Sequence, residues 1–129
     1  MQGLHLTGDL SGCRCAPLCL TDPATLETLC LAAVRAAGLS QVNHLFHSFA
    51  NDGNQIPSGS GVTGVVLLAE SHLAVHTWPE LNAVTLDVYV CNYGGDNSAK
   101  ARALFDELLR VFDPAQQDMQ TLLRGRAAA

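Results

Sequence analysis

The middle of the chain, residues 61–91, constrains the fold more than any other part. Three apolar segments rich in β-branched residues follow one another there, at 61–68, 73–78 and 83–91. The third segment shows the alternation of a half-buried strand, with Val84, Leu86, Val88 and Val90 set against Thr85, Asp87 and Tyr89. Strands are therefore predicted to dominate this region.

Further strands are predicted on both sides of it. Leu4, Leu6 and Leu10 come close to alternating with polar residues, which indicates a strand ending at Ser11-Gly12. Residues 41–49 predict a second strand. The following segment, 50–60, is rich in Asn, Asp, Gly, Pro and Ser and is typical of a loop. The tail at 116–123 is predicted to be an edge strand, and the chain end from Arg124 to Ala129 is predicted to be frayed.

Two helices are predicted from their start and stop signals. Asp22 followed by Pro23 indicates an N-cap and first helical position, and Gly38 closes the apolar periodicity that follows. Asn97 or Ser98 can cap a second helix, which ends at Asp113-Pro114. The element order predicts an α+β two-layer sandwich, an antiparallel sheet with helices packed on one face. A length of 129 residues suits one domain, 1–129.

Composition narrows the functional class. A formal net charge of −5 gives no basic surface for nucleic acid and disfavours an acidic membrane surface. No apolar stretch is long enough to span a membrane and the N-terminus lacks a signal-peptide pattern, so a cytoplasmic protein is expected. Five cysteines, an odd number, do not suggest a disulfide framework. The expected partner is a small molecule or another subunit.

Residues 61–91 also concentrate groups that carry chemistry. Ser71, Thr63 and Cys91 are possible nucleophiles or proton carriers, and His76 and Glu70 can transfer protons. These types on rigid strands are compatible with catalysis. Satisfied hydroxyls, a hydrogen-bonded histidine and a buried thiol are the structural alternatives, and composition alone leaves both interpretations open.

Metal binding is the other chemistry that the pattern raises. His72-x3-His76 and His44-x2-His47 place imidazoles at short spacing, but no carboxylate or thiolate completes an obvious set. The cluster Cys13-x-Cys15-x3-Cys19 lacks the spacing of a zinc knuckle and has no second pair. We therefore expect no metal.

One motif resembles a known family. Leu68-Ala69-Glu70-Ser71-His72-x3-His76-Thr77-Trp78-Pro79-Glu80, with Cys91 following, is similar to the signature of prokaryotic S-adenosylmethionine decarboxylase proenzymes. The likeness extends to Gly12-Cys13, to His47-x-Phe49 and to the closing helix, and so covers most of the chain.

The resemblance implies self-cleavage between Glu70 and Ser71 into a β chain, 1–70, and an α chain, 71–129. It implies that Ser71 becomes a covalent pyruvoyl group, which takes up the substrate amine as a Schiff base and accepts electrons as CO2 leaves. The product, decarboxylated S-adenosylmethionine, would serve polyamine (spermidine) synthesis.

By the same resemblance, His76 is the acid–base group of processing and Cys91 protonates the α-carbon after decarboxylation. Thr63 stands where the family commonly has a serine that assists processing. Glu80 is assigned to the substrate ribose, with a solvated carboxylate as the alternative. Phe49 can stack on adenine and attract the sulfonium, or it can be core.

Two departures from the family pattern concern the substrate. The loop 50–60 is longer than expected, and Leu81-Asn82-Ala83-Val84-Thr85 replaces a small-residue pattern, with Asn92 after Cys91 in place of glycine. A pyruvoyl-dependent arginine or ornithine decarboxylase is thus the alternative, and a non-catalytic regulatory homologue is a further one. The resemblance also implies a homodimer with active sites near the subunit interface, which an exposed sheet edge would allow.

Overall fold

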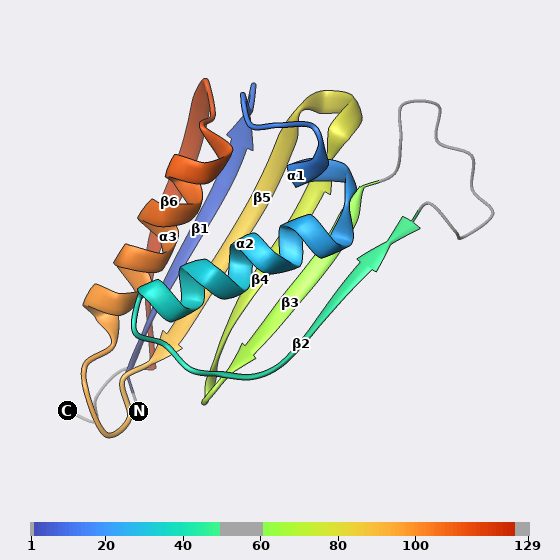
Figure 1. Ribbon diagram of the computed structural model, residues 1–129. Helices are drawn as coiled ribbons and strands as arrows, with labels where there is room; N and C mark the ends of the chain where they lie inside the picture. The colour runs from blue at the N-terminus through green and yellow to red at the C-terminus, as the bar shows by residue number, and fades with distance from the viewer. Residues whose placement is uncertain (1, 50–60, 126–129) are drawn as a thin grey trace.

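A computed structural model describes residues 2–49 and 61–125 of the chain as a six-stranded sheet with helices over one face (Figure 1). The strands are β1 (Gly3–Ser11), β2 (Gln41–Ser48), β3 (Val62–Leu68), β4 (Ser71–Trp78), β5 (Ala83–Cys91) and β6 (Gln116–Arg124). The helices are α1 (Leu18–Thr21), α2 (Pro23–Ala36), the 3-10 helix η2 (Pro79–Leu81) and α3 (Ser98–Phe112). The predicted α+β two-layer sandwich is confirmed.

The strands lie in the order β2-β3-β4-β5-β1-β6, and every neighbouring pair is antiparallel. The strand β1 lies between β5 and β6, so the first and last described strands pair. Gly3 pairs with Arg124, so the prediction that the frayed end begins at Arg124 was wrong: cross-strand hydrogen bonding holds this residue in β6. β6 is at an edge, as its sequence predicts.

The strand periodicity decides which face is covered. On β4, Leu73 and Val75 have no exposed surface and point toward the helices, whereas His72 and His76 on either side of this pair point the other way. The buried face of the sheet packs against α2 and α3. The helices contribute these buried side chains to the core: Leu26, Cys30, Ala33, Val34, Ala101, Leu104, Phe105, Leu108 and Phe112. We call the other side of the sheet the open face, because no described element covers it (Figure 1).

The helix ends follow their predicted signals with one exception. The Asp22 side chain accepts a hydrogen bond from the Thr25 backbone N–H, 3.1 Å, and Gly38 follows α2 with a positive φ of 82°. Asn97 is at the N-cap of α3, but its side chain makes no capping hydrogen bond. The prediction of the position was right and the prediction of a side-chain cap was wrong, because that amide binds elsewhere.

Two short helices were not predicted. α1 and η2 have four and three residues, too few to show a helical period in the sequence. α1 is held by the buried Thr77, whose hydroxyl donates to the Leu20 carbonyl, 2.7 Å, and accepts from the Val62 backbone N–H, 2.8 Å.

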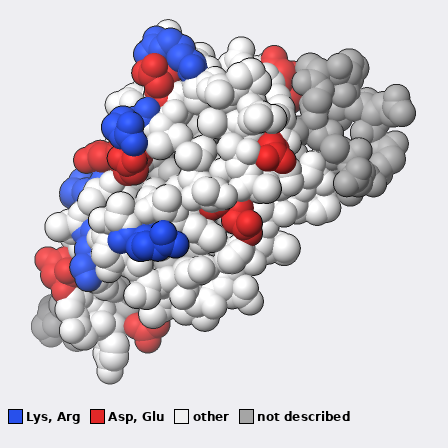
Figure 2. Space-filling model, viewed as in Figure 1, with Lys and Arg blue, Asp and Glu red and all other residues white. Residues whose placement is uncertain are grey.

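The helix-covered face carries both signs of charge. Figure 2 shows Lys and Arg interspersed with Asp and Glu, and no large area of a single sign on this face. This arrangement agrees with the absence of a nucleic-acid-binding charge pattern in the sequence.

Candidate active site

The turn between β3 and β4 contains the predicted cleavage point. Leu68 pairs with Ser71, so Ala69 and Glu70 alone connect the two strands. Glu70 has a φ of 57°, in the left-handed region, which costs a non-glycine residue roughly 1–2 kcal/mol. The peptide bond between Glu70 and Ser71 therefore directly follows a strained residue.

Ser71 is bound to the backbone of Cys91. The Cys91 N–H donates to Ser71 Oγ, 3.0 Å, across the neighbouring strands β4 and β5. Ser71 is partly buried, and Cys91 is 7% exposed. The hydroxyl oxygen accepts this hydrogen bond, which holds its position and would stabilise negative charge on it if the hydroxyl lost its proton.

Two asparagines fix Cys91 from the other side. The Asn97 side-chain amide donates to the Cys91 carbonyl, 2.9 Å. Asn92 accepts from the Asn97 backbone N–H, 2.8 Å, and donates from its side chain to Ser98 Oγ, 3.2 Å. Sequence reasoning noted Asn92 only as a departure from glycine and Asn97 only as a cap. The sequence feature that could have identified both residues is the occurrence of two asparagines within six positions after Cys91.

A surface pocket lies at this end of the sheet. Its lining residues are Glu70, Tyr89, Cys91 and Tyr93. The turn, the end of β5 and the segment after it thus form one concave surface next to Ser71.

Thr63 and His76 form a second group on the open face. They are direct cross-strand partners, and Thr63 Oγ1 lies 3.1 Å from His76 Nδ1. His76 is exposed, so its other ring nitrogen can reach a molecule that lies against the face. The Thr63 hydroxyl therefore lies next to the histidine to which the resemblance assigns acid–base chemistry.

The two predicted substrate-binding residues lie toward the Thr63 and His76 end. The Phe49 ring packs edge-on against His47, with centroids 4.8 Å apart, and His47 is the cross-strand partner of Thr63. Phe49 is 37% exposed, so it is not a core residue. Glu80 is exposed on η2, two residues after Trp78, whose ring is 6.1 Å from that of His76.

The two groups are separated within one chain. Ser71 and His76 are five residues apart on β4, which spans roughly 16 Å and places their side chains on opposite faces. The structure therefore brings Glu70, Ser71 and Cys91 together at one end of the sheet, and Thr63 and His76 together elsewhere, but it does not join the groups.

The histidine spacings considered for metal do not form sites with each other. His72 and His76 share a face, but four residues of strand hold them roughly 13 Å apart. His44 turns to the helix side, where its Nε2 pairs with Glu27 at 2.7 Å. His47 is three residues further along β2 and so faces the opposite way.

Burial disfavours the thiolate forms of Cys13 and Cys15. Burial raises the pKa of Cys15 to about 11 and shifts the pKa of Cys13 in the same direction, with Asp113 adding to the second effect. Because the thiolate is the nucleophile, these groups are unreactive compared with an activated cysteine.

The fold and site define a class: an α+β protein with a serine placed behind a strained hairpin turn and a cysteine on the next strand. The family model for S-adenosylmethionine decarboxylase matches residues 4–125. The chain is 36% identical over 123 residues to the S-adenosylmethionine decarboxylase proenzyme of Aquifex aeolicus, covering 95% of this chain and 81% of the relative. It is 40% identical over 111 residues to the proenzyme of Parasynechococcus marenigrum, covering 84% and 77%.

A solved structure agrees with these relatives. The crystal structure of the adenosylmethionine decarboxylase from Aquifex aeolicus superposes with a TM-score of 0.82 at 32% identity, covering 98% of this chain and 92% of the other. The chain belongs to the S-adenosylmethionine decarboxylase family. Among the described residues, no helix is both long enough and apolar enough to cross a membrane.

Proposed function

We propose that this chain is a proenzyme that cleaves itself between Glu70 and Ser71, and that the processed protein decarboxylates S-adenosylmethionine. The observation that supports self-cleavage most directly is the backbone conformation of Glu70, a non-glycine residue with a φ of 57° immediately before the serine. Strain of this kind costs on the order of 1–3 kcal/mol and persists where the surrounding structure imposes it. Breaking the peptide bond releases it.

The processing step follows from the position of Ser71. Its oxygen attacks the Glu70 carbonyl, the peptide C–N bond breaks, and an ester replaces the amide. Loss of the Ser71 α-proton then breaks the Cβ–O bond and leaves Glu70 as a free carboxylate. Water adds to the resulting enamine and ammonia leaves, so residue 71 ends as a pyruvoyl group. The Cys91 N–H donates to Ser71 Oγ, 3.0 Å, and holds the oxygen in place for the first step.

The residues around Ser71 suit the group that this reaction would form. The pyruvoyl group supplies an electrophilic carbonyl that withdraws electrons as CO2 is lost. Cys91, whose backbone is held by both Ser71 and Asn97, is the proposed proton donor to the substrate α-carbon. The pocket lined by Glu70, Tyr89, Cys91 and Tyr93 offers a place for the amino-acid end of the substrate.

A homodimer is proposed to complete the site. Within one chain His76 lies roughly 16 Å from Ser71, too far for a proton transfer. A two-fold axis over the open face, perpendicular to the strands, would lay the Thr63 and His76 end of one sheet against the end of the other that holds Cys91 and the cleavage turn. The Ser71 side chain turns to the helix side, so residue 71 would have to reach His76 at the end of its sheet. The open face suits this role because it exposes apolar side chains, including Leu45 (68%), Leu67 (46%) and Trp78 (38%).

Phe49 and Glu80 would then approach the substrate together with His76. An aromatic ring can stack on adenine and attract the sulfonium charge, and a carboxylate can accept hydrogen bonds from ribose hydroxyls. Both side chains are exposed and lie toward the His76 end of the sheet.

Cleavage and decarboxylation are tested separately. Wild-type protein is expected to run as two fragments, 1–70 and 71–129, and to release CO2 from S-adenosylmethionine but not from arginine or ornithine offered in parallel. Ser71→Ala is expected to remain one chain and to be inactive. If CO2 is released only from arginine or ornithine, the pyruvoyl mechanism stands but the proposed substrate is wrong. If the wild-type chain stays intact, the proposal that it is a self-cleaving proenzyme is wrong.

A mixed dimer tests whether two copies share a site. Expressed alone, Ser71→Ala is expected to remain uncleaved, and His76→Gln is expected to cleave about 10²- to 10⁴-fold more slowly than the wild type. When they are co-expressed, the His76→Gln chain is expected to be cleaved, because it keeps Ser71 and borrows His76 from its partner. Failure to cleave in mixed dimers of verified composition would contradict the shared site.

A further inference from the structure

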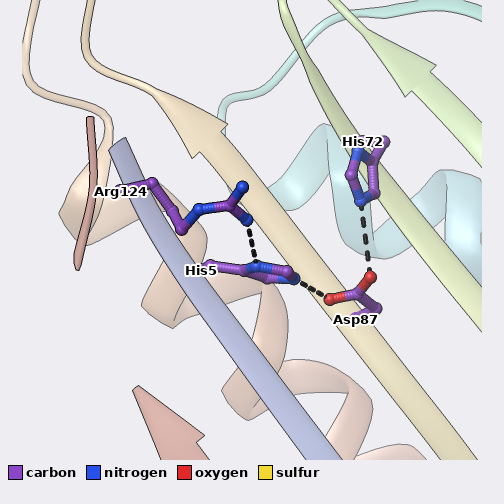
Figure 3. A network of polar contacts seen from close by, with 4 residues as sticks. All are labelled: His5, His72, Asp87 and Arg124. Atoms are coloured by element: carbon purple, nitrogen blue, oxygen red, sulfur yellow. Dashed lines mark hydrogen bonds and ion pairs between the residues drawn. The ribbon is translucent and has the colours of Figure 1, made fainter. Parts of the chain in front are cut away.

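Three polar side chains from three neighbouring strands converge on the open face (Figure 3). His5 comes from β1, Asp87 from β5 and His72 from β4, and β5 lies between the other two strands. His5 Nε2 is paired with Asp87 Oδ1, and His72 Nε2 lies 3.5 Å from Asp87 Oδ2. One nitrogen or oxygen of each residue lies within 4.8 Å of the others.

The sheet register produces this convergence. Tyr89 is the cross-strand partner of both His5 and His72. Asp87 is two residues before Tyr89 and so shares its face. Its carboxylate lies diagonally between the two imidazoles, and rigid strands hold all three positions.

We propose that His5, His72 and Asp87 bind a divalent first-row transition-metal ion, with Zn²⁺ as the representative. Two imidazole nitrogens and one carboxylate are a donor set that such ions prefer. Metal–ligand bonds of about 2.0–2.2 Å in a tetrahedral site put ligand atoms roughly 3.3 Å apart. The 3.5 Å between His72 and Asp87 fits this spacing, whereas His5 and Asp87 are in direct contact and must move apart to admit the ion. The fourth position is left for water.

Arg124 competes with the metal for His5. Its Nη1 donates to His5 Nδ1, 3.0 Å, so the neutral ring carries its proton on Nε2, facing Asp87. A metal on Nε2 displaces that proton, and a metal-bound histidine ordinarily donates from its other ring nitrogen. Arg124 must therefore release His5 Nδ1 when the metal binds. Arg124 is exposed at the end of β6, and its guanidinium lies 5.6 Å from the centre of the Tyr89 ring.

The site would also join the two processing products, a consequence that rests on the proposed function. His5 belongs to fragment 1–70, whereas His72 and Asp87 belong to fragment 71–129. His72 directly follows the residue that becomes the new chain end. A metal on His72 would therefore hold the start of β4 in place after the peptide bond before it is broken.

Metal binding is tested by titrating the purified, metal-free protein with Zn²⁺ against a chromophoric chelator, and with Co²⁺ by its visible absorption. One ion per chain is expected for the wild type. His5→Gln, His72→Gln and Asp87→Asn are expected to bind at least about 100-fold more weakly, since each loses a direct ligand. His44→Gln, on the helix side, is the matched control and should bind like the wild type.

Arg124→Ala separates a metal site from a purely structural network. Loss of the competing hydrogen bond is expected to tighten Zn²⁺ binding about 10-fold, whereas weakened binding would contradict the proposed competition. Uncleaved Ser71→Ala should bind the ion as well, which keeps this result independent of processing. A wild type without stoichiometric binding, or a folded His72→Gln that binds equally tightly, would overturn the proposal.

Discussion

The two faces of the sheet have opposite compositions along the same strands. On β4 the helix-facing residues Leu73, Val75 and Thr77 are at most 5% exposed, whereas His72, His76 and Trp78 on the open face are half-buried or exposed. The covered face provides the apolar burial that stabilises the fold, at about 1.5–3 kcal/mol for each large side chain. The open face holds His76 and its partner Thr63 and the His5, His72 and Asp87 cluster.

This difference means that stability and chemistry can be changed separately. A substitution on the covered face should alter the free energy of unfolding, because the side chains there are buried against the helices. A substitution on the open face should alter processing, assembly or ligand binding and leave the fold intact.

The largest expected effect is on processing. His76→Gln should slow self-cleavage about 10²- to 10⁴-fold, because it removes the proposed acid–base group. Its free energy of unfolding should change by less than about 0.5 kcal/mol, since His76 is exposed. Cleavage is followed by gel, with His44→Gln as control. A His76→Gln chain that matures at the wild-type rate would remove His76 from the mechanism.

The next effect contrasts two Leu→Ala changes. Leu108 on α3 has no exposed surface, and Leu108→Ala should lower the free energy of unfolding by about 2–5 kcal/mol. Leu45 on the open face is 68% exposed, and Leu45→Ala should cost less than about 1 kcal/mol while weakening dimerisation. Denaturant titration of the uncleaved Ser71→Ala form at low concentration measures the first quantity, and sedimentation measures the second. Equal costs in the monomer would contradict the asymmetry.

A smaller effect concerns the one buried polar residue among the described core positions, Thr77. Thr77→Val removes the hydroxyl that joins Leu20 to Val62 and should cost about 1–3 kcal/mol, because a buried carbonyl and N–H lose their partner. Thr85→Val, the same change on the open face, is the control and should stay within about 0.5 kcal/mol. If Thr85→Val lowers the free energy of unfolding more than Thr77→Val does, the proposed difference between the two faces is contradicted.

The smallest effect is at the cleavage turn. In the Ser71→Ala background, Glu70→Gly should raise the free energy of unfolding by about 0.5–1 kcal/mol, because glycine accepts a positive φ without strain. Glu80→Gly, at a residue with an ordinary φ, should lower it. With Ser71 restored, Glu70→Gly should cleave more slowly than the wild type. Stabilities are compared by thermal melting, and a destabilised Glu70→Gly would show that the turn stores no strain.

Much of the fold was predictable because the signals are local. The alternation at Val84 to Val90 and the caps at Asp22 and Gly38 act within a few residues, and the structure confirms them. α1 and η2 were missed because helices of three or four residues carry no periodicity. The loop 50–60 lies outside the described residues, so its predicted influence on the choice of substrate stays a prediction.

The candidate site was only partly predictable. The family motif placed Glu70, Ser71, His76 and Cys91 along the chain, and the structure shows that Ser71 and Cys91 meet while His76 stays apart. Asn97 or Ser98 was predicted to cap α3, but the Asn97 side-chain amide instead donates to the Cys91 carbonyl, a contact between β5 and the start of α3 that no local pattern shows.

The sequence by itself determined the strands, the two long helices, the family and the serine that the motif singles out, because each depends on residues that are near neighbours or on a continuous motif. Only the tertiary structure decided that β1 lies between β5 and β6, and hence that His5 reaches Asp87 across 82 positions of sequence. It also decided the separation of Ser71 from His76. Contacts between distant strands depend on the register of the whole sheet, which no local pattern specifies.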